Sequence, residues 1–132
     1  DLLAMALSER LGRTQLPSST HRSALLYRIK AHIRAHLADP ELSLAGTAAA
    51  IGISARYVND LLADEDTSFQ RYLLGERLAR CRRDLESPAF AHRHISEIAM
   101  AWGFNDLTHF GRVFRDRFGL SPREFRQSQL RH

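Results

Sequence analysis

Arginine supplies nearly all of the cationic side chains in this sequence of 132 residues. Eighteen of the 19 basic residues are arginines, and Lys30 is the one lysine. The planar guanidinium group matches phosphates and guanine edges in a bidentate way that an ammonium group does not. The charge is also uneven: residues 1–76 carry 8 basic and 9 acidic side chains, and residues 77–132 carry 11 and 6. This distribution favours nucleic acid as a partner, although a basic half can also be only a solvated surface.

A free cationic face is predicted on a helix over residues 106–118. At about 100° per residue, one side gathers the apolar residues Leu107, Phe110, Val113 and Phe114, and we expect this side to face the core. Thr108, Arg112 and Arg115 point the other way, with His109 at the margin. A helix in the major groove reads base edges mainly near its N-terminal end. We therefore expect base contacts from Thr108, His109 and Arg112, and a phosphate contact from Arg115.

A second candidate face lies on a helix over residues 55–63. Its core side is predicted to be Ala55, Val58, Leu61 and Leu62. Arg56, Asn59 and Asp60 point outward, where they suit guanine, adenine and cytosine edges respectively. The acidic residues 64–66 follow directly, so we expect weaker contact with the phosphate backbone here than from residues 106–118.

Catalytic and metal-binding patterns are weaker than these helical faces. His32 and His36 are one helical turn apart, but no HExxH glutamate lies between them and no third ligand is apparent. We expect His36, at the edge of the apolar face of its helix, to be hydrogen-bonded and half-buried instead. No Ser/His/Asp order, phosphate loop or carboxylate pair is recognisable, so we predict a protein that is not an enzyme and has no cofactor. The single cysteine, Cys81, excludes an internal disulfide and lies in a predicted core stripe, where it acts as a small buried residue.

Helical periodicity and end signals predict an all-α protein. We expect helices over residues 23–38, 44–51, 55–63, 68–86, 95–102 and 106–118, and a last helix from Pro122. Ser43, Ser54 and Ser121 are the expected N-caps, and Glu124 closes a capping box with Ser121. Since no run of about 18 apolar residues occurs, the sequence predicts no membrane-spanning helix.

The chain begins at Asp1 with no initiator methionine and no signal-peptide pattern. An apolar run, DLLAMALSERLG, is followed by the polar stretch TQLPSST. We expect residues 1–20 to be the end of an upstream domain and a linker. Residues 21–132 are expected to form one domain of a longer cytosolic protein.

Two segments of the chain repeat each other. LAGTAAAIGIS (44–54) aligns with ISEIAMAWGFN (95–105), so that Ala48 matches Ala99 and Gly52 matches Gly103. Each copy reads as a helix, a glycine turn and a second helix, which is the helix-turn-helix pattern. The small alanine permits a close helix crossing, and glycine permits the positive φ of a tight turn. The sequence therefore predicts two tandem motifs joined by the long helix over residues 68–86.

Residues 95–126, ISEIAMAWGFNDLTHFGRVFRDRFGLSPREFR, resemble the signature of the AraC/XylS family of bacterial transcription regulators. Residues 68–85 also resemble that family's linker helix, and the resemblance extends over about residues 21–131. It implies a seven-helix domain with two helix-turn-helix subdomains, at about 43–63 and 95–118. The helices over 55–63 and 106–118 would then enter adjacent major grooves of double-stranded DNA.

The resemblance also implies candidate DNA contacts. It points to base contacts from Arg56, Asn59, Asp60, Leu107, Thr108, His109, Gly111 and Arg112. Backbone contacts are predicted from Ser54, Tyr57, Arg77, Asn105, Arg115 and Arg123. The helical wheel places Leu107 on the core face, and we follow the wheel there. Asp60 stands where the family commonly has a basic residue, which weakens the prediction that the first motif reads bases.

Members of the family usually activate transcription, often touch RNA polymerase, and often carry an upstream effector-binding or dimerisation domain. The resemblance thus implies a cytoplasmic regulator that is associated with the bacterial nucleoid when bound to DNA. Its small-molecule effector would bind only through an upstream domain outside this chain, and the full-length protein can form a dimer. The alternative is a protein-interaction module with only non-specific affinity for DNA, since helix-turn-helix folds are reused.

Overall fold

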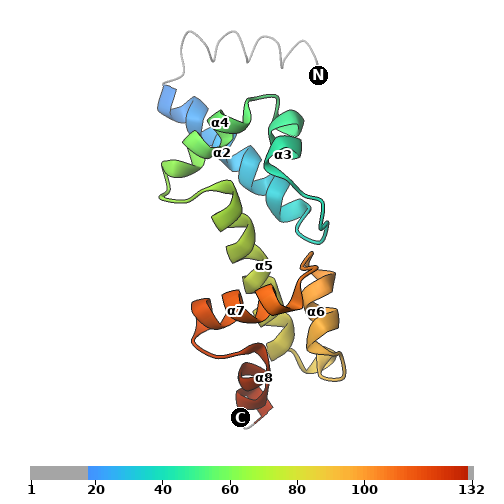
Figure 1. The fold of residues 1–132 in the computed structure, drawn as a ribbon. Coiled ribbons are helices and arrows are strands. Elements are labelled where there is room, and N and C mark those ends of the chain that lie inside the picture. The colour runs from blue at the N-terminus through green and yellow to red at the C-terminus, as the bar shows by residue number, and fades with distance from the viewer. Residues whose placement is uncertain (1–17, 131–132) are drawn as a thin grey trace.

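The computed structural model describes residues 18–130, and the predicted end of an upstream domain lies almost wholly outside this range. The described residues form seven α-helices, one short 3-10 helix and no strand, as an all-α prediction requires (Figure 1). In chain order they are α2 (Ser18–Ala35), α3 (Leu44–Ile51), α4 (Ala55–Ala63), α5 (Phe69–Glu86), η1 (Pro88–Phe90), α6 (Ile95–Ala101), α7 (Leu107–Phe118) and α8 (Pro122–Leu130).

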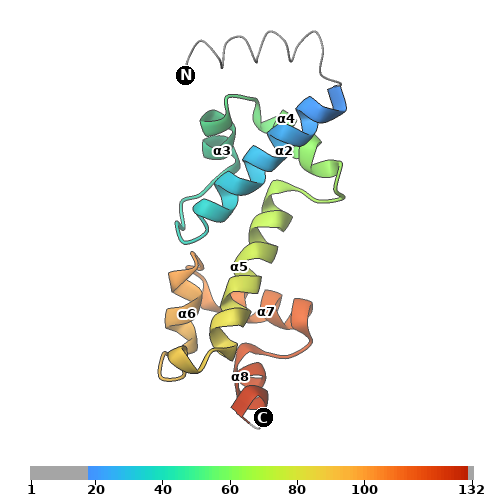
Figure 2. The same cartoon turned by 180° about the vertical axis from the view of Figure 1, so that it is seen from behind.

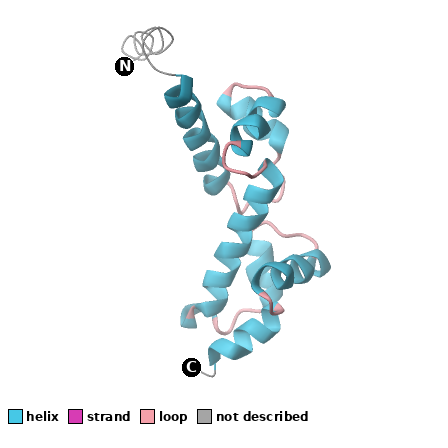
Figure 3. Cartoon of the chain, turned by 90° about the vertical axis from the view of Figure 1, so that its left-hand side faces the viewer, coloured by secondary structure: helices cyan, strands magenta, loops and turns pink. Residues whose placement is uncertain are grey.

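Two separate hydrophobic cores lie along α5, and they divide the domain into two subdomains. The first core joins α2, α3 and α4 to the start of α5 through Phe69 and Leu73. The second joins α6, α7 and α8 to the rest of α5 through Leu78, Cys81 and Leu85. Figure 3 shows the two groups of helices at opposite ends of α5. This one helix therefore belongs to both subdomains and sets the distance between them.

Local capping explains where most of the helices begin. A side-chain oxygen of the residue before the helix accepts a backbone N–H of the first turn at Ser43, Ser54, Ser68, Asp106 and Ser121. The expected capping box is present, because the Ser121 N–H also donates to Glu124 Oε1 at 3.1 Å. Replacing such a serine cap by alanine typically costs about 0.5–2 kcal/mol.

The first described helix departs from its predicted bounds. It covers residues 18–35 instead of 23–38, so residues 18–22, assigned mostly to a linker, are helical. The Ser23 hydroxyl donates to the Ser19 carbonyl at 2.9 Å, which satisfies a polar side chain inside the helix. At the other end the His36 N–H bonds to the Ile33 carbonyl at 3.1 Å, so the chain leaves the α-helix as a series of turns.

Arg77 and Gly103 lie where the two subdomains meet. Arg77, on α5, donates from Nε to the Leu37 carbonyl at 2.9 Å and from Nη2 to the Asp39 carbonyl at 2.7 Å. Gly103 has a φ of +94°, and a Cβ built on it would lie 2.6 Å from the Leu37 carbonyl oxygen. The glycine turn of the second motif is therefore pressed against the end of α2. Partial burial lowers the pKa of the Arg77 guanidinium from its usual value, but the group stays charged.

The thiol of Cys81 is predicted to be unreactive towards thiol reagents in the folded protein. Its side chain is fully buried, and this burial raises the pKa of the thiol to about 12. Since thiolate is the reactive form, labelling by a thiol-reactive disulfide at pH 8 should proceed only as fast as the protein opens. Adding urea should bring the rate to that of a free thiol. Fast labelling of the native protein would contradict this.

Candidate nucleic-acid interface

The second helix of each motif lies on the same face of the domain. In Figure 1, α4 lies in front of α2 and α7 lies in front of α5. Figure 2, from behind, shows α2 and α5 nearest to the viewer instead. A single flat or cylindrical partner can therefore contact both helices at once.

The outer face of α7 is largely as the helical wheel predicts. Phe110 and Phe114 are buried in the second core, and Thr108, Arg112 and Arg115 are exposed. Arg112 Nη2 lies 3.1 Å from Nδ1 of the half-buried His109, so the two side chains form one polar patch on the first half of the helix. Gly111 has no atom within 4 Å of a built Cβ and leaves open space beside this patch.

The prediction that Leu107 faces the core is wrong, since its side chain is 46% exposed. Leu107 is the first residue of α7, directly after the capping residue Asp106. The apolar stripe that is buried in the second core begins one turn later, at Phe110. A wheel gives the direction of a side chain but not where the neighbouring helix ends. Leu107 is therefore available to a ligand at the tip of the helix, as the family resemblance implies.

The outer face of α4 is partly engaged within the protein. Arg56 is exposed and makes no hydrogen bond or ion pair with any residue in the range 18–130. Asn59, in contrast, uses its side-chain oxygen to accept the Phe69 N–H at 2.8 Å, which holds the start of α5. Asp60 lies 3.6 Å from a guanidinium nitrogen of Arg22 on α2. Of the three predicted base contacts on α4, only Arg56 has no polar partner among residues 18–130.

Two of the three acidic residues after α4, Asp64 and Glu65, are paired with cations of α2. Arg22 donates to both carboxylate oxygens of Asp64, at 3.0–3.1 Å, and Lys30 Nζ lies 2.6 Å from Glu65 Oε2. The hydrogen bond to Asp64 raises the pKa of Arg22 above its usual value. The repulsion between these carboxylates and a phosphate is therefore reduced. Nothing in the sequence pattern pairs residues that lie 35 or more positions apart, so neither ion pair could be predicted from it.

The residues predicted to contact the DNA backbone occupy different settings. Ser54 caps α4, Tyr57 lies under the Arg22 guanidinium at 5.9 Å, and Arg115 lies 3.6 Å from Glu124. Asn105 and Arg123 are exposed. Arg77, in contrast, uses its guanidinium group within the protein, where it donates to the Leu37 and Asp39 carbonyls at the subdomain junction.

His32 and His36, which have the spacing of metal ligands, instead contact each other within α2 and the turn after it. His36 Nδ1 lies 2.7 Å from the His32 carbonyl oxygen, and the two rings are 4.3 Å apart. The prediction that His36 is half-buried is wrong, because His36 is exposed at the end of α2, where its ring bonds back to the helix; His32 is half-buried. Within residues 18–130 no three His, Cys, Asp or Glu side chains are grouped to hold a metal ion. No helix among these residues is both long and apolar enough to cross a membrane.

Comparison with known proteins shows the family to which this chain belongs. A family model described as a helix-turn-helix domain matches residues 47–128, which include the second motif and most of the first. The chain belongs to the AraC/XylS family of transcription regulators. This is a family of DNA-binding regulators rather than of enzymes.

Curated relatives of this AraC/XylS domain include two transcriptional activators. The transcriptional activator NphR of a Rhodococcus species is 37% identical over 131 residues, which are 99% of this chain and 38% of that protein. The transcriptional activator RhrA of Rhizobium meliloti is 33% identical over 127 residues, 96% of this chain and 39% of that protein. The chain thus spans about two fifths of the length of these relatives.

Solved structures show the same fold. An AraC-type transcriptional regulator from Chromobacterium violaceum has a TM-score of 0.72 and 28% identity, covering 83% of this chain and 96% of that one. A DNA-binding transcriptional dual regulator from Escherichia coli K-12 has a TM-score of 0.68 and 25% identity, covering 79% and 96%. The predicted fold and family are both confirmed.

Proposed function

We propose that this domain reads an asymmetric operator with α4 and α7 in two adjacent major grooves of double-stranded DNA. The observation that carries the proposal is the placement of both helices on one face of a domain whose halves share a single helix. Adjacent major-groove segments on one side of B-DNA are about 34 Å apart, one helical turn. A helix that belongs to both subdomains is suited to holding this spacing.

The two motifs contribute unequally in this proposal. The second reads bases through Thr108, His109 and Arg112, with Leu107 able to touch a thymine methyl group. The first reads through Arg56, while Asn59 holds the start of α5 and the exposed Asp60 lies beside Arg22. Phosphate contacts come from the exposed polar and cationic residues around the helix starts: Ser54, Tyr57, Asn105, Arg115 and Arg123.

Arg112→Ala should weaken binding to a selected operator by about 1–3 kcal/mol and relax the preference at one base position. Loss of a bidentate contact to guanine is the physical reason. Arg115→Ala, one turn further along the same face, is the matched control and should weaken binding equally on all sequences. Fluorescence anisotropy on the operator and its point variants measures both. A uniform loss for Arg112→Ala would instead make it a phosphate contact.

Selection of randomised duplex DNA by this domain at about 0.15 M salt tests the proposal as a whole. Two enriched blocks one helical turn apart are the expected result. One block would restrict base reading to α7. No enrichment, with binding that disappears as salt rises, would replace the proposal with the interaction-module alternative.

For the whole protein, we propose a bacterial cytoplasmic activator that recruits RNA polymerase. The names of NphR and RhrA as transcriptional activators support this. An effector-sensing or dimerising part would lie outside residues 21–132, which fits a chain that spans two fifths of its relatives.

A further inference from the structure

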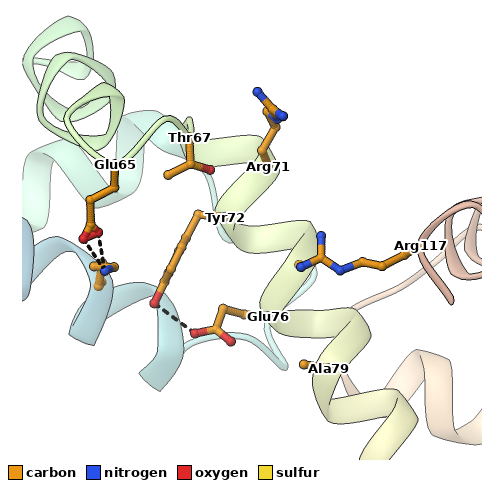
Figure 4. A pocket seen from close by; sticks show the side chains of 9 residues that line it. Glu65, Thr67, Arg71, Tyr72, Glu76, Ala79 and Arg117 are labelled. Atoms are coloured by element: carbon orange, nitrogen blue, oxygen red, sulfur yellow. Dashed lines mark hydrogen bonds and ion pairs between the residues drawn. The ribbon is translucent and has the colours of Figure 1, made fainter.

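A groove of about 450 Å³ opens between the C-terminal ends of α4 and α7. One side is formed by Glu65, just after α4, and by Lys30 of α2; α5 forms the floor, and Arg117 of α7 closes the other side (Figure 4). The groove therefore lies in the gap between the two helices that we propose to enter DNA.

The charged groups of this groove fall into two classes. Lys30 and Glu65 are paired at 2.6 Å, and Glu76 accepts the Tyr72 hydroxyl at 2.9 Å. The guanidinium groups of Arg71 and Arg117 make no hydrogen bond or ion pair with any group within residues 18–130. In Figure 4 both guanidinium groups lie on the same side of α5, one above the other. The guanidinium groups of Arg71 and Arg117 are thus available to bind a ligand.

Gly75 explains how Arg117 comes to lie there. A glycine inside a helix is destabilising relative to alanine, and Gly75 lies in the middle of α5. A Cβ built on it would be 3.2 Å from Arg117 Nη2 and 3.4 Å from Cζ. The missing side chain lets a guanidinium group from the second subdomain rest directly on the linker helix. The unfavourable residue thus has a structural use at the groove.

We propose that this groove binds the DNA phosphate backbone that passes between the two major-groove segments, with Arg71 and Arg117 as its contacts. The inference rests on the proposed two-groove function, because only then does a backbone segment cross the gap. Guanidinium groups bind phosphate oxygens through paired, charge-assisted hydrogen bonds. Lys30 offsets the charge of Glu65, whereas Glu76 keeps its charge because its partner is the neutral Tyr72 hydroxyl. The two arginines therefore outnumber the one carboxylate without a cationic partner.

The test uses the operator obtained by selection and the double variant Arg71→Met/Arg117→Met. Each phosphate contact contributes about 0.9 to the slope of log affinity against log salt. Between 0.05 and 0.2 M salt, the wild-type chain should therefore lose about tenfold more affinity than the double variant. Neutral methylphosphonates placed between the two blocks should weaken the wild type and leave the double variant unchanged.

Two further variants separate a local contact from net charge. Arg28→Met removes a charge from the exposed side of α2, about 160° around the helix from Lys30, and should leave the methylphosphonate effect intact. Gly75→Leu keeps every charge but fills the place of the Arg117 guanidinium, and should reduce that effect without lowering the urea midpoint.

The outcomes separate this inference from the proposed function. If the double variant selects the same two blocks with unchanged affinity and salt slope, the groove is not a phosphate site and the two-groove function stands. If the wild type selects no blocks, both the proposed two-groove function and the phosphate site in the groove are wrong.

Discussion

Gly103→Ala should destabilise the domain much more than Gly52→Ala, although the two glycines hold equivalent places in the two motifs. Both have left-handed backbones, with φ of +94° and +87°, so either alanine costs about 1–2 kcal/mol in backbone conformation. At Gly52 nothing lies within 4 Å of the added Cβ, so we expect no steric cost beyond this conformational cost. At Gly103 the Cβ would meet the Leu37 carbonyl oxygen at 2.6 Å and Arg77 Nη2 at 2.7 Å.

The Leu37 carbonyl and the Arg77 guanidinium, which the added Cβ would meet, cannot move independently of each other. The Leu37 carbonyl accepts from Arg77 Nε, so relieving one overlap strains the bond that holds the other. Overpacking of this kind typically adds about 1–3 kcal/mol. We therefore expect a total loss of about 2–5 kcal/mol for Gly103→Ala.

Urea unfolding followed by Trp102 fluorescence measures the difference between the two glycine variants. Trp102 packs against both cores and donates to Asp84 at 2.7 Å, so its environment changes when the subdomains separate. Equal losses for the two variants would show that the contact between Gly103 and the end of α2 is loose in solution.

Helix ends and core faces could be predicted because their causes are local in sequence. Ser43, Ser54 and Ser121 cap the helices that follow them, through bonds to residues three positions away. Helical spacing alone puts Val58 and Phe114 inside, and both are completely buried. Motif repetition then identifies the exposed helices α4 and α7 as a pair.

The roles of individual polar side chains could not be predicted in this way. Arg77 bonds to a carbonyl 40 residues away, and Asn59 bonds to an N–H across the loop between α4 and α5. Periodicity gives the direction of a side chain but not which backbone group lies opposite it. Two residues predicted to contact DNA thus hold the domain together, and two arginines of the central groove, Arg71 and Arg117, were not singled out.

Ala79→Pro should abolish tight two-block binding while leaving each subdomain folded. Residue 79 lies in the interior of α5, between Leu73 of the first core and Cys81 of the second. Proline there removes the bond from the residue 79 N–H to the Gly75 carbonyl and clashes with that carbonyl, at a cost of about 3 kcal/mol or more. The resulting kink rotates one subdomain against the other, so α4 and α7 can no longer enter their grooves together.

Circular dichroism and anisotropy on one-block and two-block duplexes measure this effect. The proline variant should keep most of its helical signal and bind both duplexes equally weakly. Ala79→Gly is the matched control: it costs about 1 kcal/mol in helix stability but keeps the backbone N–H, so it should still prefer the two-block duplex. Arg77 lies within the kinked turn, and its bonds to Leu37 and Asp39 tie α5 to the first subdomain only, so they do not hold the orientation of α7. If the proline variant preferred the two-block duplex as the wild type does, α5 would not be the rigid spacer that bipartite reading requires.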